Sequence, residues 1–360
     1  MERLVHRLAQ ALAANHELGV IGPEGAGALL PTEVRTREVP SRPLWRFLLS
    51  SAVAVLGSTR GRDADWVVAG SGLTAPLAWW AARRMRARFA VYAHGLDIVA
   101  PSRVYQWLWL PFIRRADIVF ANSRNTRRLA IERGVPGDAI RLLHPGTDLP
   151  GYQPEGGVQF RQSHGLGDRP VLLSVGRFTP RKGLAEFILH AMPAILARRP
   201  DTLVVVIGAD ATDAVARTAG SQQARILECA EQAGVATAIR MLPPCDDRTL
   251  FAAYQAADVH VFPVVDVPGD VEGFGMVAIE AAAHGAPTVG FAVGGVPDAI
   301  IENATGSLVA ANDYEAFVER VFYWLDLSRN VGARQRCAVA ASEYAWSRFG
   351  ERLQEILGRS

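Results

Sequence analysis

Apolar and polar positions follow two different periods along the whole chain. Short, continuous apolar runs rich in Val, Ile and Leu are followed by longer segments in which apolar residues recur every three or four positions. The short runs are typical of parallel strands buried on both faces, and the longer segments are typical of the helices that cover them. The alternation therefore predicts repeated βαβ units and mostly parallel sheets.

The expected elements follow from these runs. In the first half, strands are expected at 18–21, 66–69, 89–93, 118–121 and 140–143, and helices at 44–56, 76–86, 105–115 and 126–133. In the second half, strands are expected at 171–175, 203–207, 259–262 and 288–291. Helices are expected there at 184–198, 221–233, 248–256, 274–284, 314–325 and 335–357.

A segment rich in Gly and Pro, opened by His144-Pro145-Gly146-Thr147-Asp148, interrupts the alternation up to Gly157 and is typical of a linker. The 360 residues also exceed the usual size of a single core. We expect an α/β chain with two doubly wound, Rossmann-like domains facing a central cleft, at residues 1–150 and 151–340. Residues 341–360 are expected to form a C-terminal helix that packs back towards the N-terminal domain.

Composition indicates an ordinary globular protein, with 49% hydrophobic and 21% charged residues. No segment is long and apolar enough to span a bilayer, and the first residues do not resemble a signal peptide. The three cysteines, Cys229, Cys245 and Cys337, are widely spaced, which predicts neither a disulfide framework nor a metal site. We therefore expect a cytoplasmic protein that binds no metal.

Charge is distributed unevenly although the net charge is only +2. Residues 1–150 contain 20 arginines and 12 acidic residues, whereas residues 151–360 contain 18 basic and 24 acidic residues. An anionic partner of the first half is one interpretation, and solvated surface arginines are the other. A nucleic-acid partner is not expected, because the basic residues form no reading helix and the overall charge is near neutral.

Lys182 is the only lysine among 38 basic residues. It follows Arg177 in Val175-Gly176-Arg177-Phe178-Thr179-Pro180-Arg181-Lys182-Gly183, between an expected strand and an expected helix. A compact ammonium group suits a single phosphoryl group better than the rigid fork of Arg does. The turn therefore predicts a phosphate site, unless the lysine is a chance residue in an arginine-rich chain.

Two glutamates stand eight positions apart in Glu272-Gly273-Phe274-Gly275-Met276-Val277-Ala278-Ile279-Glu280, where a Gly-Phe-Gly turn opens a helix. Backbone N–H groups at a helix N-terminus bind anions, and carboxylates accept hydrogen bonds from sugar hydroxyls. The alternative interpretation is a capped helix with one buried Glu bonded inside the protein.

Together with Gly294-Gly295-Val296-Pro297, these motifs resemble the retaining, nucleotide-sugar-dependent glycosyltransferases of family four, which have the GT-B fold. The resemblance covers most of the chain and includes His94-Gly95-Leu96-Asp97, Ala121-Asn122-Ser123, Pro145-Gly146-Thr147-Asp148, Gly306-Ser307-Leu308-Val309 and Tyr344-Ala345-Trp346. Within the family the chain is similar to mannosyltransferases that act on phosphatidylinositol mannosides and to related lipid- or polysaccharide-directed enzymes.

The resemblance implies a clamp on the donor diphosphate. Gly176, Arg177 and Lys182 would hold the diphosphate and stabilise its charge as it leaves, without a metal or another cofactor. In retaining members of the family the departing phosphate is thought to act as the base for the acceptor hydroxyl. No protein nucleophile is then required.

The resemblance also implies how the donor's sugar and ribose are held. The backbone of Gly273, Phe274 and Gly275 would hold the phosphate or sugar, Glu272 would accept hydrogen bonds from the donor sugar, and Glu280 from the ribose. His94 would bind a hydroxyl near the reacting sugar. A histidine after a strand is more often structural, which is the alternative for His94.

The start of the sequence departs from the family pattern. Residues 1–8 match the family's first helix, which is usually preceded by a strand and a glycine-rich loop. We expect Met1 to be an internal start or a truncation, so that upstream DNA encodes that strand and loop. The vacant position would expose strand edges in the first sheet.

Aromatic residues beside arginines mark two segments of the first half. They are Trp79-Trp80 with Arg83, Arg84, Arg86 and Arg88, and Tyr105, Trp107, Trp109 and Phe112 with Arg114-Arg115. Such segments suit an anionic membrane surface, with core packing as the alternative. A peripheral location at the inner face of the cell membrane would follow from the first interpretation.

The predicted function is transfer of a hexose of the mannose or glucose type, with retention, from a nucleotide-diphosphate sugar to a lipid-linked, polysaccharide or other glycan acceptor. One alternative is a nucleotide-sugar isomerase of the same fold. Another is a catalytically impaired binding or partner subunit, since the glycine-rich loop is not in the sequence.

Overall fold

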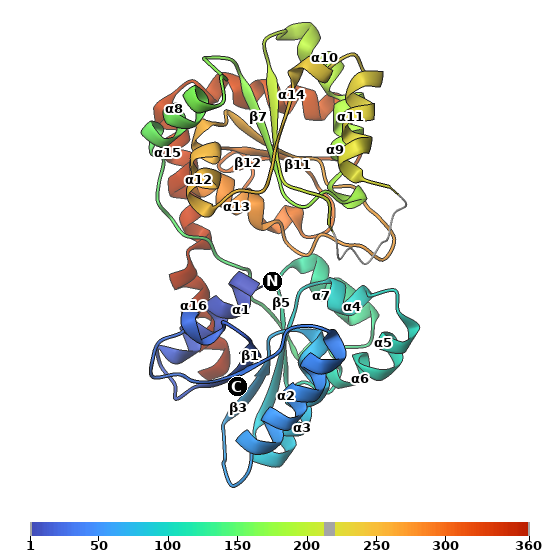
Figure 1. Ribbon diagram of the computed structural model, residues 1–360, viewed down its shortest axis with the longest axis vertical. Helices are drawn as coiled ribbons and strands as arrows, with labels where there is room; N and C mark the ends of the chain where they lie inside the picture. Colours follow the sequence, from blue (N-terminus) through green and yellow to red (C-terminus); the bar gives the residue numbers. More distant parts are fainter. Residues whose placement is uncertain (1, 212–219, 359–360) are drawn as a thin grey trace. The chain divides into compact units, whose positions relative to one another are not determined.

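The computed structural model describes residues 2–211 and 220–358, and these residues form two compact units (Figure 1). The first unit comprises the chain up to Gly146 together with the segment from Trp346 onward. The second unit runs from Thr147 to Ala345.

The first unit contains a four-stranded parallel sheet in the order β3-β4-β5-β6 and a separate parallel pair, β1-β2. The strands are β1 (Gly19–Pro23), β2 (Arg35–Val39), β3 (Trp66–Ala69), β4 (Arg88–Ala93), β5 (Ile118–Ala121) and β6 (Ile140–Leu142). Within the described residues, β1 and β3 each have a strand partner on one side only. Both strands are accordingly less buried than β4 and β5.

Helices cover both faces of the four-stranded sheet. The helices of this unit are α1 (Glu2–Ala13), α2 (Leu44–Ser58), α3 (Ala75–Met85), α4 (Leu96–Val99), α5 (Arg103–Leu108), α6 (Leu110–Ile113), α7 (Arg124–Glu132) and α16 (Trp346–Gly358). Among them, α2 packs on β1, β2 and α3. Alternate residues of β4 point to opposite faces, so that Phe89 and Val91 pack with α3 and α6 while Ala90 and Tyr92 pack with α1 and α16.

The last helix of the chain packs in the first unit. Its buried residues Phe349, Leu353 and Leu357 recur every four positions, as do Leu4, Leu8 and Leu12 of α1, and both sets join one core cluster. The helix begins at Trp346, because residues Ala341–Tyr344 form a 3-10 turn that belongs to the second unit.

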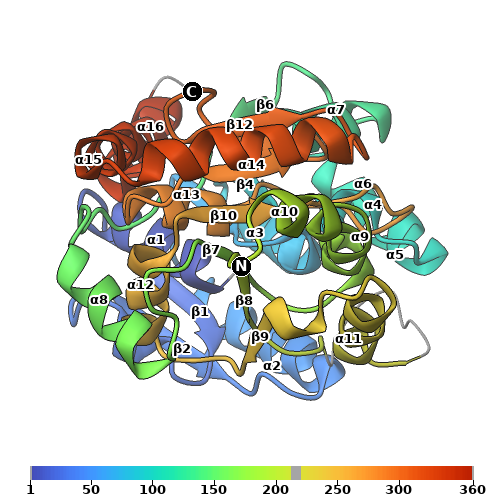
Figure 2. The same ribbon diagram turned by 90° about the horizontal axis from the view of Figure 1, so that it is seen from above.

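The second unit contains a six-stranded parallel sheet in the order β9-β8-β7-β10-β11-β12 (Figure 2). The strands are β7 (Val171–Val175), β8 (Leu203–Ile207), β9 (Ile239–Leu242), β10 (Val259–Phe262), β11 (Thr288–Phe291) and β12 (Gly306–Val309). Counted along this unit, the order is 3-2-1-4-5-6, which is the doubly wound Rossmann order. The direction of winding reverses between β7 and β10.

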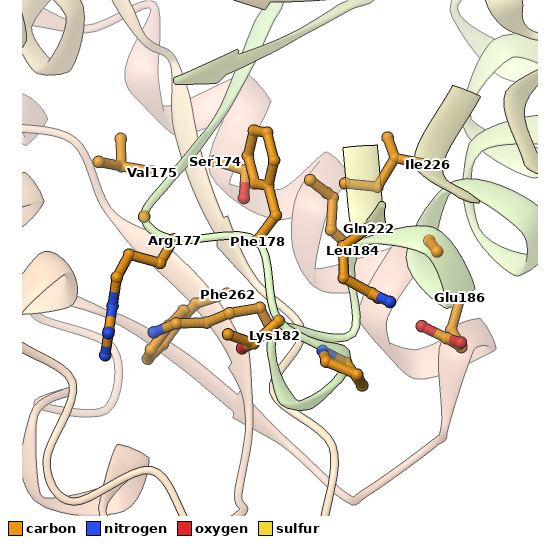
Figure 3. A pocket seen from close by; sticks show the side chains of 14 residues that line it. Ser174, Val175, Arg177, Phe178, Lys182, Leu184, Glu186, Gln222, Ile226 and Phe262 are labelled. Atoms are coloured by element: carbon orange, nitrogen blue, oxygen red, sulfur yellow. The ribbon is translucent and has the colours of Figure 1, made fainter. Parts of the chain in front are cut away.

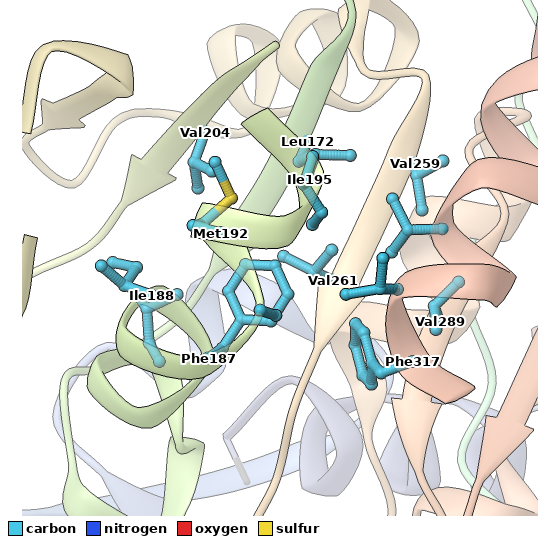
Figure 4. Packing of buried hydrophobic residues seen from close by; sticks show 14 of the residues in the cluster. Leu172, Phe187, Ile188, Met192, Ile195, Val204, Val259, Val261, Val289 and Phe317 are labelled. Atoms are coloured by element: carbon cyan, nitrogen blue, oxygen red, sulfur yellow. The ribbon is translucent and has the colours of Figure 1, made fainter. Parts of the chain in front are cut away.

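The helices of the second unit form a layer on each face of the sheet. They are α8 (Pro154–Ser163), α9 (Leu184–His190), α10 (Met192–Arg198), α11 (Gln222–Gln232), α12 (Asp247–Ala256), α13 (Met276–Ala283), α14 (Tyr314–Ser328) and α15 (Val331–Ala340). Phe187, Met192 and Phe317 pack from α9, α10 and α14 onto Val204 and Val261 (Figure 4). On the other face, α8 and α12 pack through Phe160 and Tyr254.

Three expected helices are broken in the structure. The helix expected at 335–357 is divided into α15, the 3-10 turn at Ala341–Tyr344 and α16. The helix expected at 184–198 is divided into α9 and α10 at Ala191, because Pro193 has no N–H and its ring clashes with the carbonyl of the preceding turn. Pro111 likewise follows the break between α5 and α6 inside the helix expected at 105–115. Throughout residues 2–211 and 220–358, no helix has both the length and the apolar character needed to cross a membrane.

Candidate functional site

The candidate site lies at the carboxyl ends of β7 and β10, the two strands between which the winding of the second sheet reverses. Ligands bind at this position in doubly wound sheets, because the loops after the two strands diverge to opposite faces. A pocket opens there in the second unit (Figure 3). Its lining includes Gly176, Arg177 and Lys182 from the β7 turn and Phe262 from the end of β10.

The turn after β7 is held tightly against the loop after β10. Gly183 has φ 62°, and a Cβ there would lie 2.0 Å from the carbonyl oxygen of Pro263. Only glycine permits this backbone approach. The N–H of Val265 also donates to the carbonyl of Arg181 at 2.9 Å. The two loops therefore form a single rigid edge, and Figure 3 shows the charged ends of Arg177 and Lys182 on the same side of it.

Four charged side chains form a buried network across this edge. Lys182 Nζ donates to Glu272 Oε2 at 2.8 Å, and Arg181 Nε donates to the same oxygen at 3.3 Å. Arg181 Nη1 donates to Asp270 Oδ1 at 2.9 Å. The ammonium group of Lys182 also lies 4.7 Å from the centre of the Phe262 ring, where cation–π attraction stabilises it. The network thus fixes both Lys182 and Glu272 in place.

Burial and charge shift the pKa values of this pair. Burial lowers the pKa of Lys182 below its usual 10.5, although Glu272 opposes the shift. Burial raises the pKa of Glu272, but Lys182, Arg181 and Arg177 together outweigh it and hold the pKa below the usual 4.5. Glu272 is therefore an ionised acceptor at neutral pH.

A second turn brings backbone amides to the same place. Gly275, with φ 113°, precedes α13, and Gly295 packs so closely that a Cβ there would lie 2.1 Å from the carbonyl oxygen of Gly273. The N–H of Gly295 donates to the carbonyl of Glu272 at 2.8 Å. The Phe274 side chain is buried and packs on Tyr344. Only the backbone of residues 273–275 is thus available to a ligand, together with the positive end of the α13 dipole.

Glu280 lies on α13 and is 8% exposed. Its Oε2 accepts a hydrogen bond from the Tyr254 hydroxyl at 3.3 Å. This contact accounts for part of its burial, and a role in binding ribose hydroxyls stays a prediction. His284, one turn further along, is also buried and binds the carbonyl of Glu280 through Nδ1 at 2.7 Å.

His94 belongs to the first unit, whereas the other expected site residues belong to the second. It follows β4, and its Nε2 donates to the carbonyl of Gly70 at 2.8 Å. The ring lies 5.1 Å from that of Tyr92, and the backbone carbonyl of His94 accepts from Asn122 Nδ2 at 3.3 Å. These contacts fix the ring at the carboxyl edge of the first sheet.

Arg181 and Asp270 are members of the network that the sequence did not single out. Each stands beside an expected site residue in the chain, at one or two positions from Lys182 and Glu272 respectively. One sequence signal could have identified them. The loop after the strand at 259–262 is acidic and the turn after the strand at 171–175 is basic, and these two strands are neighbours in a doubly wound sheet. Among residues 2–211 and 220–358, no group of three His, Cys, Asp or Glu side chains is arranged to hold a metal ion.

Comparison with known families assigns both halves of the chain. Residues 158–344 match the family described as Glycosyl transferases group 1, and residues 1–150 match the one described as Glycosyltransferase Family 4.

Characterised relatives cover most of the sequence. The chain is 30% identical over 369 residues to the GDP-mannose-dependent alpha-(1-6)-phosphatidylinositol monomannoside mannosyltransferase of Mycolicibacterium smegmatis, covering 96% of this chain and 91% of the relative. It is 32% identical over 240 residues to the D-inositol 3-phosphate glycosyltransferase of Mycobacterium leprae, covering 65% of this chain and 52% of the relative. The chain therefore spans about half the length of relatives of this second kind.

Solved structures share the fold at low sequence identity. Anabaena HepE in complex with UDP-glucose has a TM-score of 0.77 and 20% identity, covering 100% of this chain and 96% of that one. A glycosyltransferase from Rickettsia africae has a TM-score of 0.78 and 19% identity, covering 99% and 94%. The expected α/β architecture is thereby confirmed. The chain belongs to the group 1 glycosyltransferases, and its two units have the GT-B fold.

Proposed function

We propose that this protein is a retaining hexosyltransferase that uses a nucleotide-diphosphate sugar. The acceptor is a glycan, either lipid-linked or part of a polysaccharide. The observation that carries the proposal is the pair of cations, Arg177 and Lys182, in a pocket at the reversal point of a Rossmann sheet, with the ionised Glu272 beside them. A relative described as GDP-mannose-dependent, and a similar structure solved in complex with UDP-glucose, support a donor of the mannose or glucose type.

The diphosphate of the donor would bind at the pocket edge. Lys182 and Arg177 supply positive charge from the turn after β7, and the backbone amides of residues 273–275 would add to it from the start of α13. Both hydrogen bonds that Glu272 accepts in the network use Oε2. Its Oε1 can therefore accept a donor-sugar hydroxyl while Oε2 still holds Lys182. Glu280 would accept from the ribose hydroxyls.

The reaction breaks the bond between the anomeric carbon and the phosphate oxygen, and the electron pair leaves with the nucleoside diphosphate. Arg177 and Lys182 neutralise the charge that develops on this leaving group, so a metal ion is not required for that task. The acceptor hydroxyl attacks the same face of the sugar and gives its proton to the departing phosphate. Configuration at the anomeric carbon is retained.

Each unit would bind a different substrate. Residues 1–150 would present the acceptor, with His94 bonded to a hydroxyl of the reacting sugar, and residues 151–340 would bind the donor. We place the protein in the cytoplasm at the inner face of the cell membrane, where a lipid-linked acceptor is found. No nucleic acid takes part.

Calorimetric binding of UDP, GDP, ADP and their sugar conjugates tests this proposal. We expect one diphosphate to bind the wild-type chain and to bind Lys182→Ala about 10- to 100-fold more weakly, since a charge-assisted hydrogen bond contributes about 1.5–3 kcal/mol. Arg198→Ala is the control, because Arg198 is an exposed cation of the same unit, paired with Glu319. Equal affinity in Lys182→Ala and wild type would contradict the assigned site.

Product analysis separates the alternatives. A transferase releases free nucleoside diphosphate and forms an acceptor product of retained configuration. Conversion of the donor to an epimeric nucleotide sugar would instead indicate an isomerase, and binding without any turnover would indicate a partner subunit.

A further inference from the structure

Helix α2 presents several large apolar side chains to solvent, while Ser51, Ala54 and Val55 face the protein. Trp45, Leu49 and Val53 are each about 60% exposed, and Leu56 is 51% exposed. The side chains that face inward include Ser51, which is 5% exposed. This is the reverse of the usual pattern for a helix that covers a sheet. The exposed face of α2 is therefore shaped for a contact with something other than the core of this unit.

The exposed apolar residues form a continuous stripe. Positions 45, 49, 53 and 56 recur at intervals of four, four and three, so they follow one face of the helix over about 16 Å. We name Trp45, Leu49, Val53 and Leu56 the α2 stripe. Exposed apolar patches of this kind mark interaction sites, because isolated surface residues do not align along a helix.

The segment that contains the α2 stripe is rich in arginine. From Val39 to Arg62 the chain contains four arginines and no acidic residue. Arg42 and Arg46 stand at the start of α2, and Arg60 and Arg62 follow its end. Arg37 lies against the last turn, since a Cβ at Gly57 would be 2.9 Å from its Nη1.

The neighbouring helix, α3, is also rich in arginine and has an exposed tryptophan. Helix α3 packs beside α2, and the segment from Trp66 to Leu96 again contains four arginines and no acidic residue. Trp80 is 37% exposed, with the Arg84 guanidinium 5.7 Å from its ring centre. By contrast, Trp79 packs on Phe112 with ring centres 5.3 Å apart, which is the core packing that was the alternative for this residue.

An anionic lipid surface fits this combination of features. Arg side chains pair with lipid phosphates, while Trp, Leu and Val enter the boundary between headgroups and acyl chains. A second copy of the chain fits less well, because a symmetric contact would bring the same arginines face to face.

We propose that α2 is the membrane-docking element of this protein and lies in the interface of an anionic bilayer, with the α2 stripe directed into it. The inference rests on the proposed function in one respect, since a lipid-linked acceptor would be reached at the membrane surface. It assigns the contact to a helix outside the two aromatic segments that composition alone suggests.

Co-sedimentation of the full chain with vesicles tests the proposal. One set of vesicles contains phosphatidylcholine only, and the other also contains phosphatidylglycerol. We expect the wild type to bind the second set at low salt. The affinity for these vesicles should fall about tenfold or more in Leu49→Ser/Val53→Ser, because neither position would bury an apolar side chain in the bilayer. Arg42→Gln/Arg46→Gln is expected to weaken binding to the anionic vesicles and to reduce its dependence on salt.

The matched control is Val331→Ser/Val339→Ser on α15, where both valines are at least 52% exposed. These substitutions remove similar exposed area outside the α2 stripe, and binding should stay as in the wild type. Thermal unfolding of each variant checks that it is folded.

Three results would overturn the proposal. They are no vesicle binding by the wild type, equal binding by Leu49→Ser/Val53→Ser and the wild type, and a wild-type dimer that the α2 substitution dissociates. The last result would make the stripe a contact between copies. Nucleotide binding is measured on the same preparations, so failure of the donor site is recognised independently of failure to dock.

Discussion

Arg181 connects the two acidic residues of the site. It is 7% exposed and binds both Asp270 and Glu272. Replacing it with Met removes the guanidinium group that pairs with Asp270 at 2.9 Å. A buried carboxylate without a partner destabilises a fold by about 3–5 kcal/mol. Glu272 also loses one of its two cations, so its orientation towards the donor sugar is weakened.

We therefore expect Arg181→Met to lower the unfolding free energy and to raise the KM for the donor. Arg181→Lys should restore part of both, because an ammonium group can still pair with one carboxylate. A role in orienting Glu272 also predicts that the acidic limb of the activity profile moves to higher pH in Arg181→Met, since one cation that lowers the pKa of Glu272 is gone. An unchanged acidic limb would indicate a structural role only.

Lys182 makes donor binding depend on pH. The ammonium form binds the diphosphate, and burial lowers the pKa of Lys182 below 10.5. Affinity should therefore be full at low pH and should fall as the pH rises, at a pH below that of an ordinary lysine. In Lys182→Arg, calorimetric titrations should show affinity that stays constant over the same range, because guanidinium groups remain protonated.

At this scale the sequence predicted the residues that stand inside recognisable motifs, namely Lys182, Arg177 and Glu272. It did not predict how they are bonded. Arg181 and Glu272 are 91 positions apart, and which oxygen accepts which hydrogen depends on the path of two loops. Side-chain pairing of this kind is determined by the tertiary structure. Neighbouring residues in the sequence do not indicate which distant side chain is the partner.

At the scale of elements, most of the buried strands were predicted, whereas β2, β9 and β12 were not. β7, β8 and β10 are mostly apolar and lie where they were expected. β2 was not expected, because Arg-Thr-Arg-Glu-Val has charged residues at most positions, and four of its five residues are not buried. An edge strand needs one neighbour and little core contact, so its sequence carries a weaker pattern.

The turn between β7 and α9 requires glycine at position 183, which can be tested by substitution. Gly183→Ala places a Cβ 2.0 Å from the carbonyl oxygen of Pro263 in addition to the left-handed φ of 62°. Gly165→Ala is the matched control, since Gly165 also has φ 62° but nothing lies within 4 Å of its Cβ position.

The left-handed conformation alone costs about 1–2 kcal/mol in either variant. Chemical unfolding should show a larger loss of stability in Gly183→Ala, and its donor affinity should fall because the two loops are pushed apart. Equal losses in both variants would mean that the turn relaxes easily and does not hold the site rigid.

At the scale of the whole molecule, the alternating pattern sufficed to predict two α/β units, and the order of the second sheet explains where its site is. The reversal between β7 and β10 brings together loops that are about ninety positions apart in sequence. The helix at the C-terminus belongs to the first unit, so this unit is formed by both ends of the chain. Because the described residues form two compact units, unfolding is not expected to be a single two-state transition.

Acid should weaken the second unit through a histidine at its centre. His260 on β10 is fully buried, and burial together with the nearby Lys182 lowers its pKa from 6.5 to about 3. The unfolded chain therefore binds a proton that the folded chain does not bind between these two values. The contribution of His260 to stability is complete above pH 6.5 and is lost progressively as the pH falls towards 3.

Calorimetric unfolding between pH 7 and pH 5 measures this loss, and the transition of the second unit is the one that a bound nucleotide raises. We expect its midpoint to fall with pH in the wild type and to fall less in His260→Gln, which has no proton to gain in this range. His190→Gln, at an exposed position on α9, should behave like the wild type. If His260→Gln follows the wild-type curve, the acid sensitivity arises from other groups. Glu272 is not a source of that sensitivity, because its pKa is lowered below 4.5 and its contribution is lost only at a pH below this range.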